Sequence, residues 1–224
     1  MTISRALLEN KHHRVPPDYY DTGIQTNVFQ RYWHTRRFDV VCEMIGSING
    51  RLLDIGCHGG TFTSQIIQRT GPTEVVGIDI IRESVKYAAI QLPGAQFVCA
   101  NGLALPFQDA HFDVITCLEA LEHVESPGQV LLESRRCLRG NGDLLVLVPS
   151  ENWLFRFIWY FWTKFKGRVW DGVHIQQFKH QTLDILLEET GFQIVQRRAF
   201  LLGMLIAIKA RKPSSSSPQR TGEC

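Results

Sequence analysis

Leu52-Leu-Asp-Ile-Gly-Cys-His-Gly-Gly60 decides the fold, because a short apolar run leads directly into a glycine-rich loop. A second apolar run, Glu74–Asp79, ends in an acidic residue about twenty residues further on. Glycines let a strand-to-helix turn approach a ligand closely, and a carboxylate at the end of the second strand can accept both hydrogens of a ribose diol. Dinucleotide sites use GxGxxG spacing to seat a pyrophosphate, whereas these glycines follow Asp54 and fall at 56, 59 and 60. The loop therefore favours a nucleotide-type ligand that carries positive charge, with a purely structural tight turn as the alternative.

The regions around this loop alternate between short β-branched runs and segments long enough for helices. We predict strands at 51–56, 74–79, 96–99, 112–117 and 143–148, and helices at 28–45, 61–69, 82–91, 127–139 and 179–190. Two further apolar runs, 192–198 and 200–209, are separated by almost nothing and predict a closing antiparallel hairpin. The fold class is thus α/β, a doubly wound and mostly parallel seven-stranded sheet with an antiparallel C-terminal hairpin.

Three regions of the chain differ in composition. Residues 1–27 are polar, are broken by Pro16-Pro17 and show no helical or strand period, which predicts a flexible N-terminal arm. Residues 28–212 carry the α/β pattern and form one predicted domain. The Ser/Pro-rich residues 213–224 predict a disordered tail.

Composition excludes several classes of protein. The 224 residues are 44% apolar, and 24 basic against 22 acidic side chains give a net charge of +2, so no polyanionic partner such as nucleic acid is indicated. The six cysteines are widely spaced without a CxxC pair, which argues against a zinc ribbon or a dense disulfide framework and favours a reducing, cytoplasmic setting. No apolar stretch reaches the roughly 18 residues that span a bilayer, and the N-terminus has no signal-like apolar core.

Residues 28–209 resemble the class I S-adenosylmethionine-dependent methyltransferases, in particular the ubiquinone-pathway O-methyltransferases, in several motifs that occur in the same order. The stretch 52–60 is similar to the first motif of the family, although His58 stands where the family usually has glycine. A non-glycine residue there needs an accommodating backbone angle, and we expect Gly59 to take over part of the bend. Leu138-Arg-Gly-Asn-Gly142 stands where the family often reads Lys-Pro-Gly-Gly.

The resemblance implies a binding site for the methyl donor S-adenosylmethionine. Asp79 matches the acidic residue that holds the ribose hydroxyls, and Asn101 stands where the family usually has an aspartate that contacts the adenine amino group. The side-chain oxygen of Asn101 can accept the same hydrogen bond. The predicted donor-site residues are Asp54, Gly56, Gly60, Asp79, Ile80, Asn101, Gly102 and Leu118, the last near the reactive end.

Three ionisable residues follow the fourth predicted strand at positions i, i+3 and i+4: Glu119, Glu122 and His123. A helix there would project all three side chains from one face. In the ubiquinone-pathway group a similar segment and a later histidine, here His174, imply a divalent metal that binds the acceptor hydroxyls. A set of two carboxylates and two imidazoles suits zinc, manganese or iron better than magnesium. The alternative is a metal-free turn in which the glutamate acts as a cap. His123 is the candidate catalytic base, with His174 as a second candidate.

The segment 152–170 holds four of the five tryptophans and four basic residues without an acidic one. As a helix over 153–168 it would present an apolar face with a cationic end, which suits peripheral contact with an anionic membrane. The alternatives are a lid over the substrate pocket, a dimer contact and, disfavoured by the near-neutral net charge, RNA stacking.

The sequence therefore predicts an S-adenosylmethionine-dependent methyltransferase acting on a hydroxyl of a small lipophilic acceptor, with a lipid-like molecule as one candidate. A noncatalytic donor-binding or membrane-interaction module is the alternative from another class, motivated by His58 and the basic aromatic segment. An NAD-dependent oxidoreductase is disfavoured by the glycine spacing and by the lack of an evident Tyr-x-x-x-Lys pair. Neither the identity of the acceptor nor an oligomeric state follows from the sequence.

Overall fold

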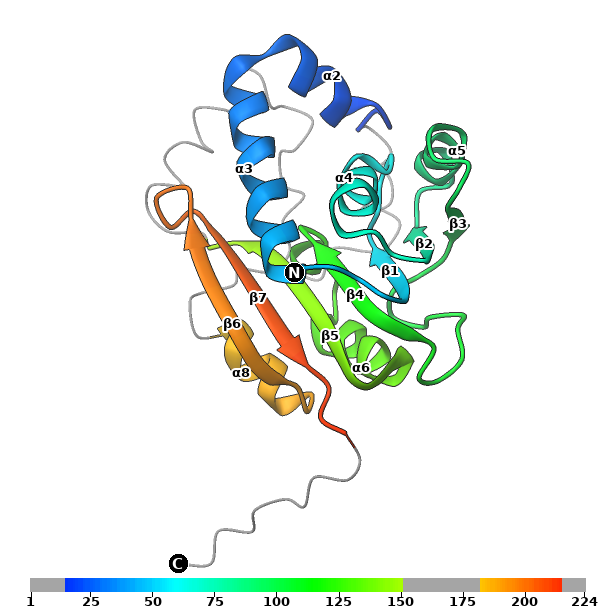
Figure 1. Ribbon diagram of the computed structural model, residues 1–224, viewed down its shortest axis with the longest axis vertical. Coiled ribbons are helices and arrows are strands. Elements are labelled where there is room, and N and C mark those ends of the chain that lie inside the picture. Colours follow the sequence, from blue (N-terminus) through cyan, green and yellow to red (C-terminus); the bar gives the residue numbers. More distant parts are fainter. Residues whose placement is uncertain (1–14, 151–181, 215–224) are drawn as a thin grey trace, which may run out of the picture.

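The computed structural model describes residues 15–150 and 182–214, which form an α/β sandwich around one seven-stranded sheet (Figure 1). The strands lie in the order β3-β2-β1-β4-β5-β7-β6. Strands β1 to β5 pair in parallel, and β7 lies antiparallel between β5 and β6. The strands are β1 (Arg51–Ile55), β2 (Glu74–Asp79), β3 (Gln96–Cys99), β4 (Phe112–Leu118), β5 (Leu138–Pro149), β6 (Gln193–Phe200) and β7 (Leu205–Arg211). The predicted fold class is confirmed, including the antiparallel C-terminal strands.

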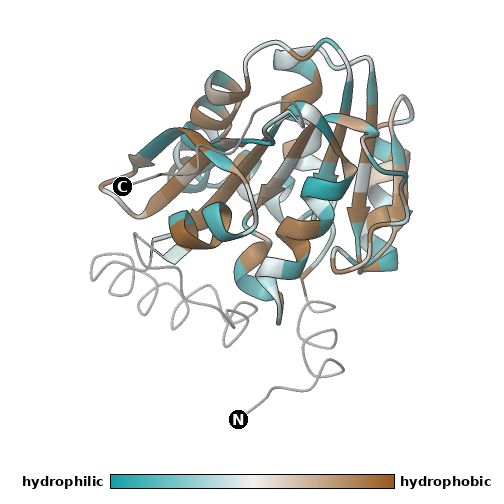
Figure 2. Ribbon diagram, turned by 90° about the horizontal axis from the view of Figure 1, so that it is seen from below, coloured by the Kyte–Doolittle hydropathy of each residue, from teal (hydrophilic) through white to brown (hydrophobic). Residues whose placement is uncertain are grey.

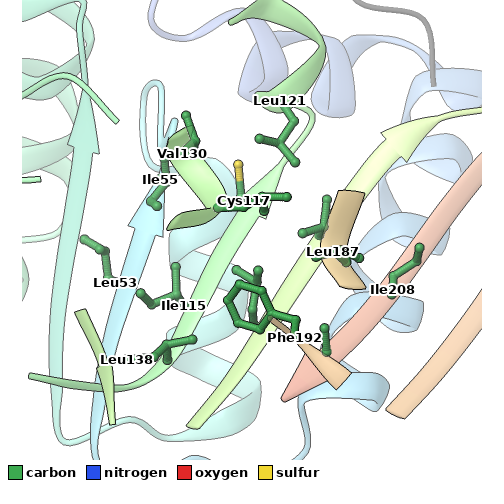
Figure 3. Packing of buried hydrophobic residues seen from close by; sticks show 14 of the residues in the cluster. Leu53, Ile55, Ile115, Cys117, Leu121, Val130, Leu138, Leu187, Phe192 and Ile208 are labelled. Atoms are coloured by element: carbon green, nitrogen blue, oxygen red, sulfur yellow. The ribbon is translucent and has the colours of Figure 1, made fainter. Parts of the chain in front are cut away.

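Helices cover both faces of the sheet, and alternate residues of the central strands supply a core to each face. On β1, Leu52 packs in a cluster with α3 and α4, whereas Leu53 packs on the opposite side with α6 and α8. Figure 3 shows the second cluster, where Leu53 and Ile115 of the strands meet Leu187 of α8. The hydropathy colouring places apolar residues along the inner strands and mixed residues on the helices (Figure 2). The helices are α2 (Tyr19–Thr26), α3 (Val28–Ile45), α4 (Thr61–Thr70), α5 (Arg82–Gln91), α6 (Pro127–Cys137), α8 (Thr182–Glu189) and the 3₁₀ turn η1 (Leu121–His123).

Residues 15–27 do not form the loose arm that their polar sequence predicted. Helix α2 packs against α3, and the Asn27 side chain caps α3 by accepting hydrogen bonds from the backbone N–H groups of Phe29 and Gln30. Helix α2 has only eight residues and none of them is fully buried, so no apolar period announces it. It is held instead by tertiary contacts, including the 3.0 Å hydrogen bond from the Thr61 hydroxyl to Asp21 and the burial of Val15.

Several element boundaries differ from the prediction. Helix α6 ends at Cys137, because Leu138 already pairs with Phe112 as the first residue of β5. The hairpin strands β6 and β7 are separated by residues 201–204, a turn in which Leu201 and Leu202 have φ values of 51° and 58°. Leucine is rare in that left-handed region, so only Gly203, with a φ of 75°, marks this turn in the sequence. The first part of the predicted helix at 179–190 lies outside the described residues.

Candidate functional site

A cavity of about 210 Å³ lies at the carboxyl ends of β1, β2 and β4. Parallel strands end at the same edge of a sheet, so residues distant in the sequence meet there. Most of the predicted donor-site residues line it: Asp54, Gly56, Asp79, Ile80, Asn101, Gly102 and Leu118. Glu119 and His123 line it as well, whereas Gly60 and Glu122 are not among its lining residues.

The glycine loop holds its shape through backbone hydrogen bonds and positive φ angles. Gly56 has a φ of 77°, and its N–H donates to the Ile78 carbonyl at 2.8 Å. A Cβ on Gly56 would lie 2.6 Å from the Ala120 side chain, so glycine is required by space as well as by φ. His58 has a φ of 47° and bears the left-handed conformation itself.

Gly59 and Gly60 play different parts from those predicted. Gly59 is not among the residues with positive φ, so it does not share the bend at His58. A Cβ on Gly59 would instead lie 2.1 Å from the Pro17 carbonyl oxygen, which packs on the loop. Gly60, with a φ of 83°, is the N-cap of α4, and its missing Cβ makes room for Ala88 and Leu92. It serves helix packing rather than the cavity wall.

Asp79 has a geometry that fits a ribose. One carboxylate oxygen accepts the His58 backbone N–H at 2.9 Å, and the other accepts the Ile81 backbone N–H at 2.9 Å. Each oxygen retains a lone pair for another donor. The carboxylate is therefore held in a fixed orientation at the cavity and can accept the two hydroxyl hydrogens of a ribose diol.

Asp54 is a buried acid at the same end of the cavity, 2% exposed. Its carboxylate accepts hydrogen bonds from the hydroxyls of Thr63 at 2.6 Å and Thr116 at 2.7 Å. Burial raises the pKa of Asp54 to about 6, although the two hydroxyl hydrogen bonds lower it. A cationic ligand beside it would favour the charged form.

The Asn101 side-chain oxygen already accepts the Leu103 backbone N–H at 3.0 Å, which shapes the loop after β3. This contact holds Asn101 at the cavity wall. The oxygen still has one lone pair for the predicted bond to an adenine amino group.

The segment after β4 differs from the predicted metal site. Glu119 has a φ of 53° and precedes η1, so Glu119, Glu122 and His123 do not share one helix face. The Glu119 carboxylate instead accepts a hydrogen bond from the Arg37 guanidinium at 2.5 Å. Over residues 15–150 and 182–214 no cluster of three or more histidine, cysteine, aspartate or glutamate side chains is placed to hold a metal ion. The predicted ligand His174 lies outside the described residues.

These residues do not fit the predicted metal, because an arginine already neutralises Glu119 and the expected helical set is not formed. Burial raises the pKa of Glu119, while the Arg37 charge and hydrogen bond lower it. The described residues therefore do not support the metal interpretation, and His123 remains a candidate base on the cavity wall.

The sequence analysis missed the residues that the N-terminal helices contribute. Tyr20 of α2 and Arg37 of α3 line the cavity, and Arg37 is only 3% exposed. A signal for Arg37 did exist: at three- and four-residue spacing, His34, Arg37 and Val41 follow the buried stripe of α3. A charged residue inside an apolar stripe indicates a buried partner, here Glu119.

Comparisons with known proteins agree with this architecture. Residues 53–146 match the family model described as a methyltransferase domain. An uncharacterized methyltransferase of Synechocystis is 31% identical over 166 residues, which cover 72% of this chain and 75% of that protein. The ubiquinone biosynthesis O-methyltransferase of Leptothrix cholodnii is 31% identical over 124 residues, 52% of each chain. The matched region spans about half the length of such ubiquinone-pathway relatives.

A solved structure shows the same fold. The S-adenosylmethionine-dependent methyltransferase of Mesorhizobium loti aligns with a TM-score of 0.65 at 18% identity, over 77% of this chain and 96% of that one. With the cavity at the carboxyl ends of β1, β2 and β4, these relationships establish that the chain belongs to the class I S-adenosylmethionine-dependent methyltransferases.

None of the helices in the described ranges combines the length and the apolar character that crossing a membrane requires.

Proposed function

We propose that this methyltransferase transfers the methyl group of S-adenosylmethionine to a hydroxyl oxygen of a small lipophilic acceptor. The observation that carries the proposal is that one cavity is lined both by the carboxylates Asp54 and Asp79, which we assign to a donor end, and by Leu121 and His123, which we assign to an acceptor end. Relatives named for ubiquinone biosynthesis support an acceptor of the phenolic, lipid-like class.

The polar end suits the donor. Asp79 orients the ribose, Asp54 faces the positively charged amino acid part, and Asn101 and Gly102 border the base. Bound S-adenosylmethionine supplies an electrophilic methyl group attached to a sulfonium. The glycine loop and Ile80 line the same cavity.

The other end suits the acceptor. Leu118, Leu121 and Val124 give it apolar walls that an aromatic or prenylated molecule can contact. His123 is the proposed base: as the oxygen–carbon bond forms and the carbon–sulfur bond breaks with its electron pair going to sulfur, His123 takes the hydroxyl proton. Histidine is the side chain most often used as a base near neutral pH.

The test is methyl transfer by the purified chain from S-adenosylmethionine to a panel of catechols and phenols with and without prenyl chains, read by mass spectrometry. We expect an O-methylated product from at least one lipophilic phenol and none from the Asp79→Ala variant. Donor binding without transfer to any acceptor would support the noncatalytic module, and a product methylated on carbon or nitrogen would contradict the oxygen acceptor.

The predicted membrane contact of segment 153–168 lies outside the described residues and remains a proposal from sequence. Replacing Trp159 and Trp162 with alanine is expected to weaken sedimentation with anionic vesicles. Unchanged vesicle binding would contradict the proposal and favour the substrate lid.

A further inference from the structure

Arg37 places a buried positive charge in the wall of the cavity. Its side chain is 3% exposed and forms an ion pair with Glu119, a residue 82 positions away in the chain. The guanidinium also lies 5.0 Å from the centre of the Phe62 ring and 5.9 Å from that of Tyr20. Two aromatic faces and one carboxylate therefore fix its orientation.

His34 holds the guanidinium from a third side. The distance from the Arg37 Nη1 atom to His34 Nδ1 is 2.8 Å, and because arginine only donates, His34 must accept through Nδ1. His34 is therefore neutral, with its proton on Nε2. Burial and the arginine charge lower the pKa of His34 to about 2, which agrees with this assignment.

Arg37 has N–H donors beyond the two that His34 and Glu119 accept. Among the described residues, no hydrogen-bond acceptor lies within reach of the buried Nε atom of Arg37. The Nη1 and Nη2 atoms already donate to His34 and Glu119. A buried donor without an acceptor is costly, and charged donors favour charged oxygen acceptors.

The carboxylate in this ion pair, that of Glu119, is one of the predicted metal ligands. Glu119 carries a strained left-handed backbone at the end of β4, and this conformation presents its carboxylate to Arg37. The cation beside Glu119 is thus supplied by helix α3 of the chain itself.

We propose that Arg37 binds the acceptor in place of a divalent metal, by holding an ionisable hydroxyl as its oxyanion beside the guanidinium in the cavity wall. The acceptor class is then a phenol, catechol or enol rather than an ordinary alcohol. This inference rests on the proposed function, since it assigns the oxygen that receives the methyl group. The hydroxyl proton goes to His123, and the charge of Arg37 stabilises the oxygen that remains.

The probe is 4-nitrocatechol, whose visible absorbance reports its ionisation. It is titrated into the full chain saturated with S-adenosylhomocysteine, so that binding is measured without turnover. We expect the wild-type protein to bind the ionised form and Arg37→Met to weaken binding by about tenfold to 100-fold. Treatment with EDTA is expected to leave the probe affinity of both proteins unchanged.

Three controls separate the role of Arg37 from folding. Arg36→Met alters the neighbouring residue of α3, whose exposed side chain lies 3.7 Å from Asp39, and should leave probe binding unchanged. Arg37→Lys keeps the charge but lacks the planar donor set, and should weaken binding about threefold to tenfold. Binding of S-adenosylhomocysteine, measured by calorimetry on each variant, reports an intact fold and donor end. If Arg37→Met fails to fold, the probe affinity of Arg37→Lys tests the role of Arg37.

Unchanged probe affinity in a folded Arg37 variant overturns the inference, as does probe binding that EDTA abolishes and manganese restores. Failure of the wild-type protein to bind 4-nitrocatechol also overturns it. The proposed function fails separately, when the acceptor panel yields no O-methylated product. A product that forms equally well with Arg37→Met would keep the proposed function and remove this role of Arg37.

Discussion

The two ends of the cavity are built in different ways. The donor end consists of strand termini and the loops that follow them, and its key contacts join backbone N–H groups to Asp79 or hydroxyls to Asp54. The proposed acceptor end is assembled from helices α2 and α3 and the turn after β4, which the ion pair between Arg37 and Glu119 joins. The donor end is fixed by the sheet, whereas the acceptor end depends on how the N-terminal helices dock.

This difference predicts that the two ends respond independently to mutation. The donor end should keep its geometry as long as the sheet is folded. The acceptor end should be sensitive to changes in α2 and α3, which lie on one side of the sheet (Figure 1). Donor affinity and acceptor affinity are therefore separable measurements.

The largest effect is expected at Asp79. Replacing it with alanine removes the ribose acceptor and also releases the backbone N–H groups of His58 and Ile81, which shape the loop. Two charge-assisted hydrogen bonds contribute about 3 kcal/mol or more, so we expect donor affinity to fall by about 100-fold or more. Calorimetric titration with S-adenosylmethionine measures this.

Asp79→Asn is the matched control, because one oxygen remains and the volume is unchanged. Its donor affinity should lie between those of the wild-type protein and Asp79→Ala. An Asp79→Ala variant that is folded and binds donor normally would show that the ribose lies elsewhere.

The next effect concerns the coupling between Arg37 and Glu119. Removing either partner leaves a buried group without its counter-charge, so the double-mutant cycle of Arg37→Met and Glu119→Gln should give a coupling energy of about 2 kcal/mol in urea unfolding. The exposed pair Arg69 and Asp39, 2.7 Å apart, should give less than about 1 kcal/mol. Equal coupling energies in the two cycles would mean that burial does not strengthen the ion pair between Arg37 and Glu119.

The meeting of Asp54, Gly56 and Asp79 at one cavity could be predicted from sequence, whereas the pairing of Arg37 with Glu119 could not. Asp54, Gly56 and Asp79 belong to a local motif whose spacing follows from strand, loop and helix, so their meeting was foreseeable. The pairing of Arg37 with Glu119 depends on a helix docking across 82 positions and on a left-handed φ at a glutamate. Helical spacing after β4 suggested a metal cluster because nothing local reveals that the chain turns at Glu119.

The fold shows the same division. The alternating pattern predicted α3, β2 and α5 with the bounds that the structure has, because each buries a regular stripe or an apolar run. Helix α2 was missed because it is short and is held by contacts such as that between Asp21 and Thr61. Only tertiary structure makes that segment helical.

Donor binding should depend on pH through Asp54. The pKa of this buried carboxyl is raised to about 6 in the folded protein, and a cationic ligand favours its ionised form. Below pH 6 binding must release a proton, so affinity should fall by up to tenfold per pH unit, or about tenfold between pH 7 and pH 5. The titration is performed calorimetrically in buffers of different ionisation heats, which also count the released proton.

The contribution of Asp54 to the free energy of unfolding changes with pH in the opposite direction to that of an acid in a salt bridge. The folded protein binds this proton more tightly than the unfolded chain, in which the pKa of Asp54 is near the ordinary aspartate value of 3.8. The contribution of Asp54 to the free energy of unfolding should therefore decrease as the pH rises from about 4 to 6. Asp54→Asn should bind donor more weakly and without this step, and a step that persists in the variant would assign it to another group.

The smallest effect is expected at Gly59, where the donor loop meets the N-terminal segment. A methyl group there would lie 2.1 Å from the Pro17 carbonyl oxygen, so Gly59→Ala should push residues 15–20 away from the loop at a cost of about 1 kcal/mol or more. The φ of Gly59 is not positive, which leaves this steric contact as the reason for the effect. We expect faster hydrogen exchange in α2, weaker 4-nitrocatechol binding and nearly unchanged donor affinity. Gly94→Ala, where an added Cβ meets nothing within 4 Å, is the control. If Gly59→Ala lowered donor affinity as much as probe affinity, the two ends of the cavity would not respond independently to mutation.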